Sequence, residues 1–192
     1  GRSLIDFVAD HASRLATDPS DTIRAAAELI VVPEFLGNRS PFAEPEARAI
    51  ISGLGMDRGI DSLAALYLAG LSGIGYGLRQ LLDKLEERGL RQSTIVVSGG
   101  AAQNTLVCQM LADSTGLAVA LPVLQEPVLR GAAMLAAVAS KVHPDVSSAM
   151  TSMSGTAQLF QPAGGDIAKL HLARYSAFSA LQTTARDLRS TV

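Results

Sequence analysis

The sequence contains one cysteine and no tryptophan, and aromatic residues make up only 4% of its 192 residues. Because a single thiol cannot form a disulfide within the chain, we expect a reducing, cytoplasmic setting. With so few aromatic rings, the core must be built from Ala, Leu, Val and Ile, as in helix-rich and α/β domains. The hydrophobic content of 48% excludes a disordered chain.

The chain also has no large excess of charge of either sign. It carries 16 Lys and Arg against 18 Asp and Glu, a net charge of −2. Nucleic acid and anionic membranes need clustered positive charge. The longest apolar runs, at 116–124 and 131–139, are well short of the ~20 residues that span a bilayer. We therefore expect neither nucleic acid nor a membrane as a partner.

Several catalytic and metal-binding motifs are missing. The three histidines lie far apart in the sequence, without HExxH or CxxC spacing, so we predict no metal site made of protein ligands alone. There is no GxSxG elbow of a hydrolase and no GxxxxGK[ST] loop of a Walker-type NTPase. The carboxylates show no pairing that would nominate a general base, so we assign no catalytic residue to this chain.

Hydrophobic periodicity predicts alternating helices and strands. Helices are expected over 6–15, 21–30, 62–88, 104–115, 128–140, 144–153 and 166–189, the third ending at Gly89. A buried strand is expected at 93–98, a second strand at 117–121 and an edge strand at 159–161, with a loop at 33–45. Such alternation predicts an α/β layer fold. Within the longest helix, Gly70, Gly73 and Gly77 share a face and predict a close approach to a neighbouring element.

The most informative segment is Ser98–Asn104, which reads SGGAAQN. A strand leads into two glycines, and we expect a helix to begin directly after them. Glycines allow a sharp turn and close contact between a ligand and the backbone, and a helix N-terminus attracts phosphate. Asn104 offers amide groups that can pair with a base such as adenine. A tight turn with a purely structural role is the alternative.

Two further segments carry candidate residues. In the Pro-bounded loop LGNRSP, Arg39 follows Asn38 and is suited to binding a phosphate or carboxylate, although a solvated surface loop has the same pattern. In the segment EPVLRGAA, Glu126 precedes a helix rich in small residues, and its simplest role is to interact with the helix dipole.

These three segments together resemble the C-terminal domain of the FGGY family of carbohydrate kinases. The matching blocks are PEFLGNRSPFAEPEARAIISGLGMD at 33–57, IVVSGGAAQNTLVCQMLADSTGLAV at 95–119 and EPVLRGAAMLAAVAS at 126–140. Asn38 and Ser98 look most like the ribulokinase, or pentulose-kinase, branch of that family. The match is specific because three blocks occur in the family's order over about a hundred residues.

The resemblance implies an actin-like, ribonuclease-H-like ATPase domain with a mixed sheet flanked by helices. It places Gly100 against the nucleotide phosphates and Asn104 against the adenine. It lines the same pocket with Gly99, Ala101 and Gln103. The family's catalytic Asp and its sugar-binding residues belong to an N-terminal domain whose motifs this chain does not contain.

From the resemblance we expect residues 1–192 to form one nucleotide-binding lobe of an ATP-dependent kinase, with ATP as co-substrate and Mg²⁺ as the metal. The expected partner is a sugar or polyol held by the N-terminal domain, with ribulose as the first choice and xylulose, ribitol or glycerol as the others. The chain could also form a homodimer. Asn38 and Arg39 are expected to contact phosphate or to form a hinge. The chain alone is expected to lack turnover. A non-catalytic actin-like ATP-binding or interaction module is the alternative.

Overall fold

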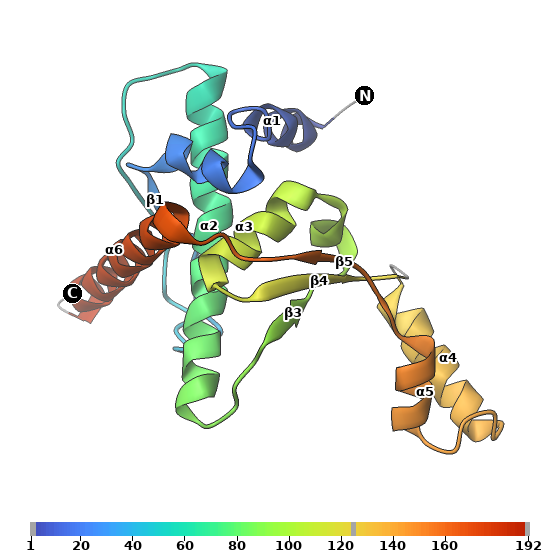
Figure 1. The fold of residues 1–192 in the computed structure, drawn as a ribbon. Coiled ribbons are helices and arrows are strands. Elements are labelled where there is room, and N and C mark those ends of the chain that lie inside the picture. The colour runs from blue at the N-terminus through green and yellow to red at the C-terminus, as the bar shows by residue number, and fades with distance from the viewer. Residues whose placement is uncertain (1–2, 124–125, 191–192) are drawn as a thin grey trace.

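The computed structural model describes residues 3–123 and 126–190. The helices, in chain order, are α1 (Leu4–Ala12), the 3-10 helix η1 (Pro19–Ala26), α2 (Ile60–Glu87), the 3-10 helix η2 (Gly99–Gln103), α3 (Thr105–Thr115), α4 (Pro127–Ala139), α5 (Val146–Met153) and α6 (Gly165–Ser190). The strands are β1 (Ile30–Val32), β2 (Ile50–Ser52), β3 (Thr94–Val96), β4 (Ala118–Pro122) and β5 (Thr156–Phe160). Helix α2 is the central element, and the other parts are arranged around it (Figure 1).

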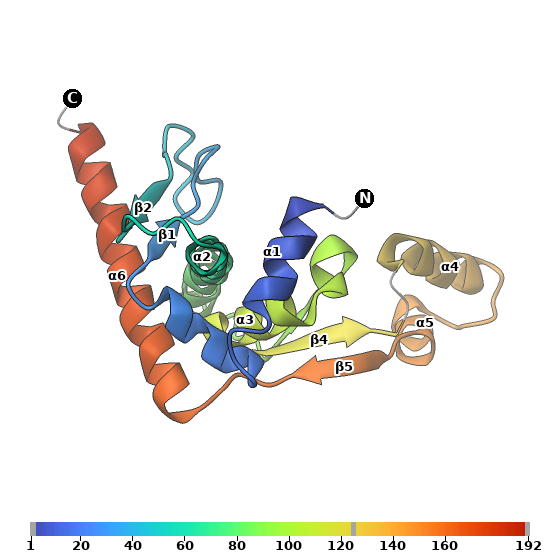
Figure 2. The same ribbon diagram turned by 90° about the horizontal axis from the view of Figure 1, so that it is seen from above.

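Two small sheets lie on different sides of α2. Strands β1 and β2 form an antiparallel pair, whereas β3, β4 and β5 form a three-stranded sheet in that order. Within the larger sheet β3 runs parallel to β4 and β5 runs antiparallel to it. Figure 2 looks along α2 and shows α6 with β1 and β2 on one side, and α1 and α3 on the other. The predicted α/β class with a mixed sheet is therefore confirmed.

Helix α2 shows how the sequence specifies an element. Its buried face is made of Ala64, Leu68 and further small residues at helical spacing, and these pack against α1, η1, α3 and β1. The helix ends as predicted at Gly89, whose φ is +79°. The N–H of Leu90 donates to the carbonyl of Leu85 at 2.9 Å, and that of Gly89 donates to Glu86 at 2.8 Å. This pair of bonds is the Schellman motif, which favours glycine at its left-handed position.

The core consists of three apolar clusters. One joins α2 to α1, η1 and α3 through residues such as Ile23, Leu68 and Met110. A second lies between α3 and the three-stranded sheet, around Cys108 and Val119. The third joins β1, α2 and α6, and its members are Ile30, Val32, Tyr76 and Phe178. Helix α6 thus holds the β1–β2 pair against the central helix.

The helix predicted over residues 21–30 is wrong. This segment forms the 3-10 helix η1, which ends at Ala26, and then the strand β1. The guanidinium of Arg174 on α6 donates to the carbonyls of Ala26 and Ala27, and to that of Leu29 at 2.8 Å. These carbonyl oxygens are taken by a side chain that is distant in sequence, so the chain can leave the helix without unsatisfied acceptors.

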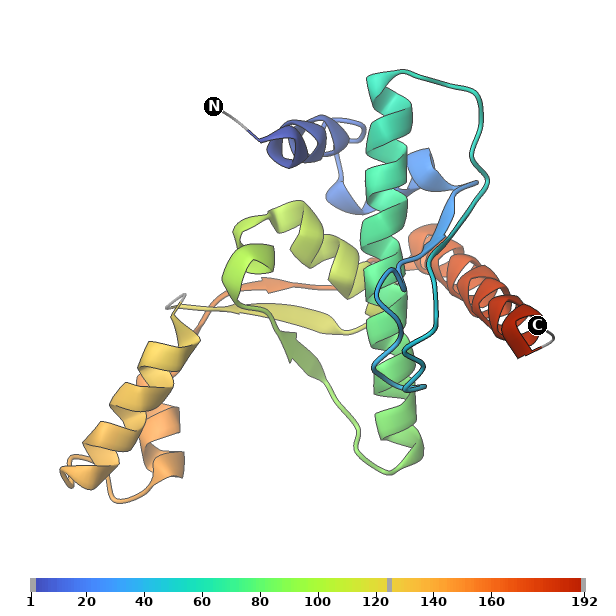
Figure 3. The ribbon, with the colours of Figure 1, turned by 180° about the vertical axis from the view of Figure 1, so that it is seen from behind.

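The burial predicted for the strand at 93–98 is also wrong. Strand β3 is at an edge of its sheet, and Val96 is 68% exposed. Helix α3 covers one face of this sheet, while α4 and α5 pair with each other beyond the ends of β4 and β5 (Figures 1 and 3). Apolar periodicity in a short strand does not reveal whether both faces are covered.

The glycines of α2 have different roles. A Cβ at Gly73 would collide with the backbone carbonyl of Val31 on β1, which confirms the predicted close approach at this position. A Cβ at Gly75 would likewise collide with the side chain of Ser114 on α3. At Gly70 and Gly77 a Cβ would meet no atom within 4 Å, so the prediction is wrong for these two positions within the part of the chain that the structure describes.

Candidate nucleotide site

The turn after β3 contains the two glycines of SGGAAQN. Gly99 has a φ of +74°, a left-handed conformation that favours glycine, and a Cβ at Gly100 would meet nothing within 4 Å. Both glycines lie within η2, and the helix predicted over 104–115 is α3, which starts at Thr105. Ser98 gives η2 no side-chain cap, which leaves the first N–H groups of this turn available to a ligand.

Asn104 is the N-cap residue of α3. Its Oδ1 accepts from the N–H of Leu106 at 2.9 Å and from that of Val107 at 3.4 Å. The expectation that the N-terminus of this helix offers unpaired N–H groups to a phosphate is therefore corrected, because the cap already binds two of them. The two N–H donors of the Asn104 amide have no partner among the described residues, and they can meet an acceptor nitrogen of a base.

A cavity of about 510 Å³ lies beside this turn, between η2, α3, α1 and α2. Of the residues predicted to contact the nucleotide, Gly100, Gln103 and Asn104 line this cavity, whereas Gly99 and Ala101 are not among its lining residues. The rest of the lining was not predicted from the sequence. It consists of Ile5, Asp6, Ala9 and Asp10 from α1, which faces the turn, Tyr67 from α2 and Val107 from α3.

The α1 wall follows from helical geometry. Ile5 and Ala9, and likewise Asp6 and Asp10, are four residues apart and so lie on one face of α1. The apolar pair can pack on a flat ring, and the carboxylates can accept hydrogen bonds from hydroxyl or amino groups. Burial, and secondarily the charge of Asp6, raise the pKa of the Tyr67 phenol above its usual range, so this group stays a neutral donor. The i, i+4 repeat was visible in the sequence, but nothing there placed it opposite Gly100.

The charges of this cavity favour the nucleoside part of a nucleotide. Among the described residues 3–123 and 126–190, the charged ones in its lining are Asp6 and Asp10, with no Lys, Arg or His. A triphosphate buried among carboxylates would be repelled, whereas a base and its ribose hydroxyls are compatible with them. The phosphates would instead lie near Gly100 and the uncapped start of η2.

The other predicted residues lie elsewhere. Asn38 and Arg39 line a second cavity of about 320 Å³, so the structure does not bring them into the cavity of Gly100. Glu126 is the exposed N-cap residue of α4 and makes no side-chain cap there. Cys108 is fully buried in the core, and burial raises the pKa of its thiol.

Comparison with known proteins assigns the domain. The sequence model of the "FGGY family of carbohydrate kinases, C-terminal domain" matches residues 6–140, well over half of the chain. This chain belongs to the FGGY family. The matched range includes residues 6–12 of α1 as well as the three motif blocks, so it covers the lining residues of the 510 Å³ cavity except Ile5.

Relatives of this FGGY domain are known as whole proteins. An FGGY carbohydrate kinase domain-containing protein of Danio rerio is 34% identical over 181 residues, covering 94% of this chain and 33% of that protein. A D-ribulokinase of Saccharomyces cerevisiae is 38% identical over 120 residues, which cover 62% of this chain and 17% of the kinase. The chain thus spans about a third of the first of these relatives and less of the second.

Solved structures confirm the actin-like ATPase fold of this FGGY domain. A xylulose kinase from Rhodospirillum rubrum superimposes with a TM-score of 0.70 at 22% identity, covering 96% of this chain and 38% of that one. A Plasmodium falciparum glycerol kinase with ADP gives a TM-score of 0.68 at 20% identity, covering 93% of this chain and 36% of that one. At these identities the likeness shows the fold alone.

Residues 3–123 and 126–190 contain neither a cluster of metal ligands nor a helix that could span a membrane. No three His, Cys, Asp or Glu side chains come together there as a set of metal ligands. The described side chains thus do not form a set of Mg²⁺ ligands by themselves. Nor do these ranges contain a helix with the length and hydrophobicity needed to cross a bilayer.

Proposed function

We propose that this domain is the nucleotide-binding lobe of an ATP-dependent kinase that phosphorylates a hydroxyl group of a pentulose or polyol, ribulose first among these. The observation that carries the proposal is the cavity beside the glycine turn, where Gly100, Gln103 and Asn104 face the Ile5–Ala9 wall of α1. Family membership supports phosphoryl transfer to a carbohydrate. The GNRSP motif and the D-ribulokinase relative support a pentulose as substrate.

In this proposal each part of the cavity has a defined role. The base packs on the apolar pair Ile5 and Ala9, and the free N–H groups of Asn104 donate to an acceptor nitrogen of the base. The carboxylates of Asp6 and Asp10 accept hydrogen bonds from ribose hydroxyls. Gly100 allows the α- and β-phosphates to approach the backbone without a Cβ between them.

The chain's own contribution to the reaction is to position the nucleotide. Phosphoryl transfer depends mainly on alignment of the reacting groups and on stabilisation of charge. The acceptor hydroxyl and its general base would come from the N-terminal domain of the whole enzyme, and closure of the two lobes would exclude water. We therefore predict that the 192-residue chain binds ADP and ATP but has no kinase activity.

Isothermal titration of the chain with ADP tests the nucleotide site. Asn104→Ser keeps an oxygen that caps α3 but removes the amide donors, so stability should change little while ADP affinity falls about three- to tenfold. Asn104→Ala should lose the same affinity and also about 1 kcal/mol of stability, because the cap is lost.

Two results would contradict the assignment. A folded chain that does not bind ADP at millimolar concentration would exclude a nucleotide site in this lobe. Unchanged ADP affinity in Asn104→Ser would show that the amide does not contact the base. As a control, Glu126→Gln lies outside the cavity and should leave ADP binding unchanged.

A further inference from the structure

The second cavity of this domain is a built polar site that the nucleotide proposal does not use. It lies between the 33–40 loop, α2 and α6 and has a volume of about 320 Å³, within the range of small-molecule pockets. Its lining includes two polar side chains that are almost completely buried, Glu34 at 7% exposed and Gln182 at 2%. Arg39 is its one basic lining residue.

The loop that carries Arg39 is held in one conformation. The backbone of Asn38 exchanges hydrogen bonds with Glu44 in both directions, at 2.8 and 2.7 Å. The Asn38 side chain donates to Oε1 of Glu34 at 2.5 Å and accepts from the N–H of Phe42 at 3.2 Å. The side chain before Arg39 is thus fixed on both sides, and so is the backbone that presents the guanidinium.

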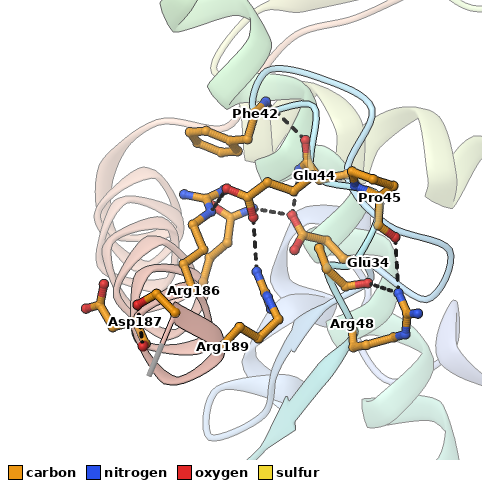
Figure 4. Close-up of polar contacts among 12 residues, drawn as sticks. Glu34, Phe42, Glu44, Pro45, Arg48, Arg186, Asp187 and Arg189 are labelled. Atoms are coloured by element: carbon orange, nitrogen blue, oxygen red, sulfur yellow. Dashed lines mark hydrogen bonds and ion pairs between the residues drawn. The ribbon is translucent and has the colours of Figure 1, made fainter. Parts of the chain in front are cut away.

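Helix α6 engages the two carboxylates of this region. Gln182 donates to Oε1 of Glu34 at 2.5 Å. Glu44 binds Arg186 at 2.8 Å through one oxygen and Arg189 at 3.0 Å through the other (Figure 4). Arg186 also lies 3.4 Å above the ring of Phe42, which anchors the far side of the loop.

As a result, the guanidinium of Arg39 is left without a carboxylate partner. Among the described residues no ion pair or hydrogen bond involves its side chain, although Glu34 and Glu44 lie in the same segment. The Oε1 atom of Glu34 already accepts from the amides of Asn38 and Gln182, so the other carboxylate oxygen, Oε2, is the one that can accept a bond from a hydroxyl group. Arg39 is exposed whereas Glu34 is buried, so the two fit a ligand with an anionic group at one end and hydroxyl groups at the other, which keeps the anionic group away from the Glu34 carboxylate.

Helix α2 leaves room for such a ligand. A Cβ at Gly77 would meet no atom within 4 Å, so a close contact with another part of the protein does not explain this glycine. Gly73, which also lines the cavity, differs because it is needed for contact with β1. Gly77 keeps the cavity open, and Ile74 and Phe178 give it apolar walls.

We propose that this cavity binds a small hydroxylated phosphate ester, with Arg39 on the phosphoryl group and the Glu34–Gln182 side on the hydroxyl groups. The site is separate from the nucleotide cavity. The two linings share no residue, and Tyr67 and Gly73, their nearest members on α2, are six residues apart, or about 9 Å along the helix. The phosphate ester can come from two sources, a free sugar phosphate or the ribose-phosphate part of a nucleotide.

Titration of the chain with ribulose 5-phosphate, inorganic phosphate and ADP tests the site. Arg39→Gln should weaken binding of ribulose 5-phosphate at least tenfold, since it removes a charge-assisted hydrogen bond. The matched control is Arg58→Gln, an equal change of charge at an exposed arginine outside both cavities. Gly77→Ala places a methyl group in the lining and should weaken binding without lowering the melting temperature, because its Cβ would meet no atom within 4 Å.

The arms of the experiment distinguish the two sources. If saturating ADP leaves the affinity for ribulose 5-phosphate unchanged, the site takes a free sugar phosphate. If ADP competes and Arg39→Gln also weakens ADP, the nucleotide itself reaches the second cavity. The proposal is overturned if ribulose 5-phosphate does not bind at millimolar concentration, or if Arg39→Gln binds it like the wild type. Asn104→Ser separately tests the nucleotide site, so either proposal can fail without the other.

Discussion

His171 should make the stability of this domain depend on pH. It is 1% exposed, between α6 and α2, and its Nδ1 is paired with the hydroxyl of Tyr76 at 2.9 Å. Its Nε2 has no hydrogen-bond partner among the described residues. Burial, together with the positive charges of Arg174 and Arg79, lowers the pKa of His171 from 6.5 to about 4.

The sign follows from linkage. The pKa is lower in the folded state, so the unfolded chain takes up the proton first as the pH falls. The stabilisation is complete above pH 6.5 and is lost as the pH falls from 6.5 to about 4. At about 1.4 kcal/mol per pH unit, this interval corresponds to a loss of about 3 kcal/mol, which is a large part of the stability of a typical domain.

Urea unfolding at about pH 7 and about pH 4.5 measures the effect. The wild type should lose most of the 3 kcal/mol between these conditions, whereas His171→Asn should lose much less, although its stability at neutral pH is lower. Asp113 acts in the opposite direction, because burial raises the pKa of its carboxyl, but it is present in both proteins and cancels in the comparison. His143→Asn, a change on the α4–α5 hairpin, serves as the control and should keep the wild-type difference.

An equal loss of stability in wild type and His171→Asn would refute this reasoning. It would mean that the buried imidazole takes up its proton at the same pH in both states. The acid sensitivity would then have to come from carboxylates. Monitoring the tyrosine signals during unfolding gives a second probe, since Tyr76 packs edge-on against the His171 ring at a centroid distance of 5.9 Å.

Further predictions concern packing and the contacts of α6. Gly73→Ala should lower the free energy of unfolding by about 1–3 kcal/mol, because its Cβ collides with β1. Gly70→Ala on the same helix should raise it by up to about 1 kcal/mol. Chemical denaturation of the two variants measures the difference. Arg174→Met should lower the free energy of unfolding by about 3 kcal/mol or more, because the carbonyls of Ala26, Ala27 and Leu29 lose their donor. Arg174→Lys should not restore the stability. If both variants were as stable as the wild type, water would have to replace the guanidinium. Glu44→Gln weakens two partly exposed ion pairs and should lower the free energy of unfolding by about 1 kcal/mol or less. Amide hydrogen exchange in the 33–45 loop should become faster. An unchanged exchange rate there would show that α6 does not hold the loop.

Periodicity and turn chemistry were enough to predict most elements. The long helix with its Gly89 end, the Asn104–Thr115 helix and the strands on either side of it follow from local pattern, because apolar spacing and left-handed glycines act within a few residues. The exceptions were β1 and β2. The predicted helix took in Ile30, the first residue of β1, and no element was predicted over β2, since only a partner strand distinguishes a three-residue strand from a helix end or a loop.

The sequence by itself determined the family, and it predicted the part of the proposed nucleotide site that lies in one segment, Gly100, Gln103 and Asn104, because residues close in the chain keep their relation in any fold. Only the tertiary structure decided that α1 forms the opposite wall of that cavity, and that Arg39 lies in a different one. It also decided that Arg174 ends η1 from more than a hundred residues away, and that α6 holds the carboxylates near Arg39. Such contacts depend on how helices pack around α2, and packing is a property of the whole chain that no local pattern encodes.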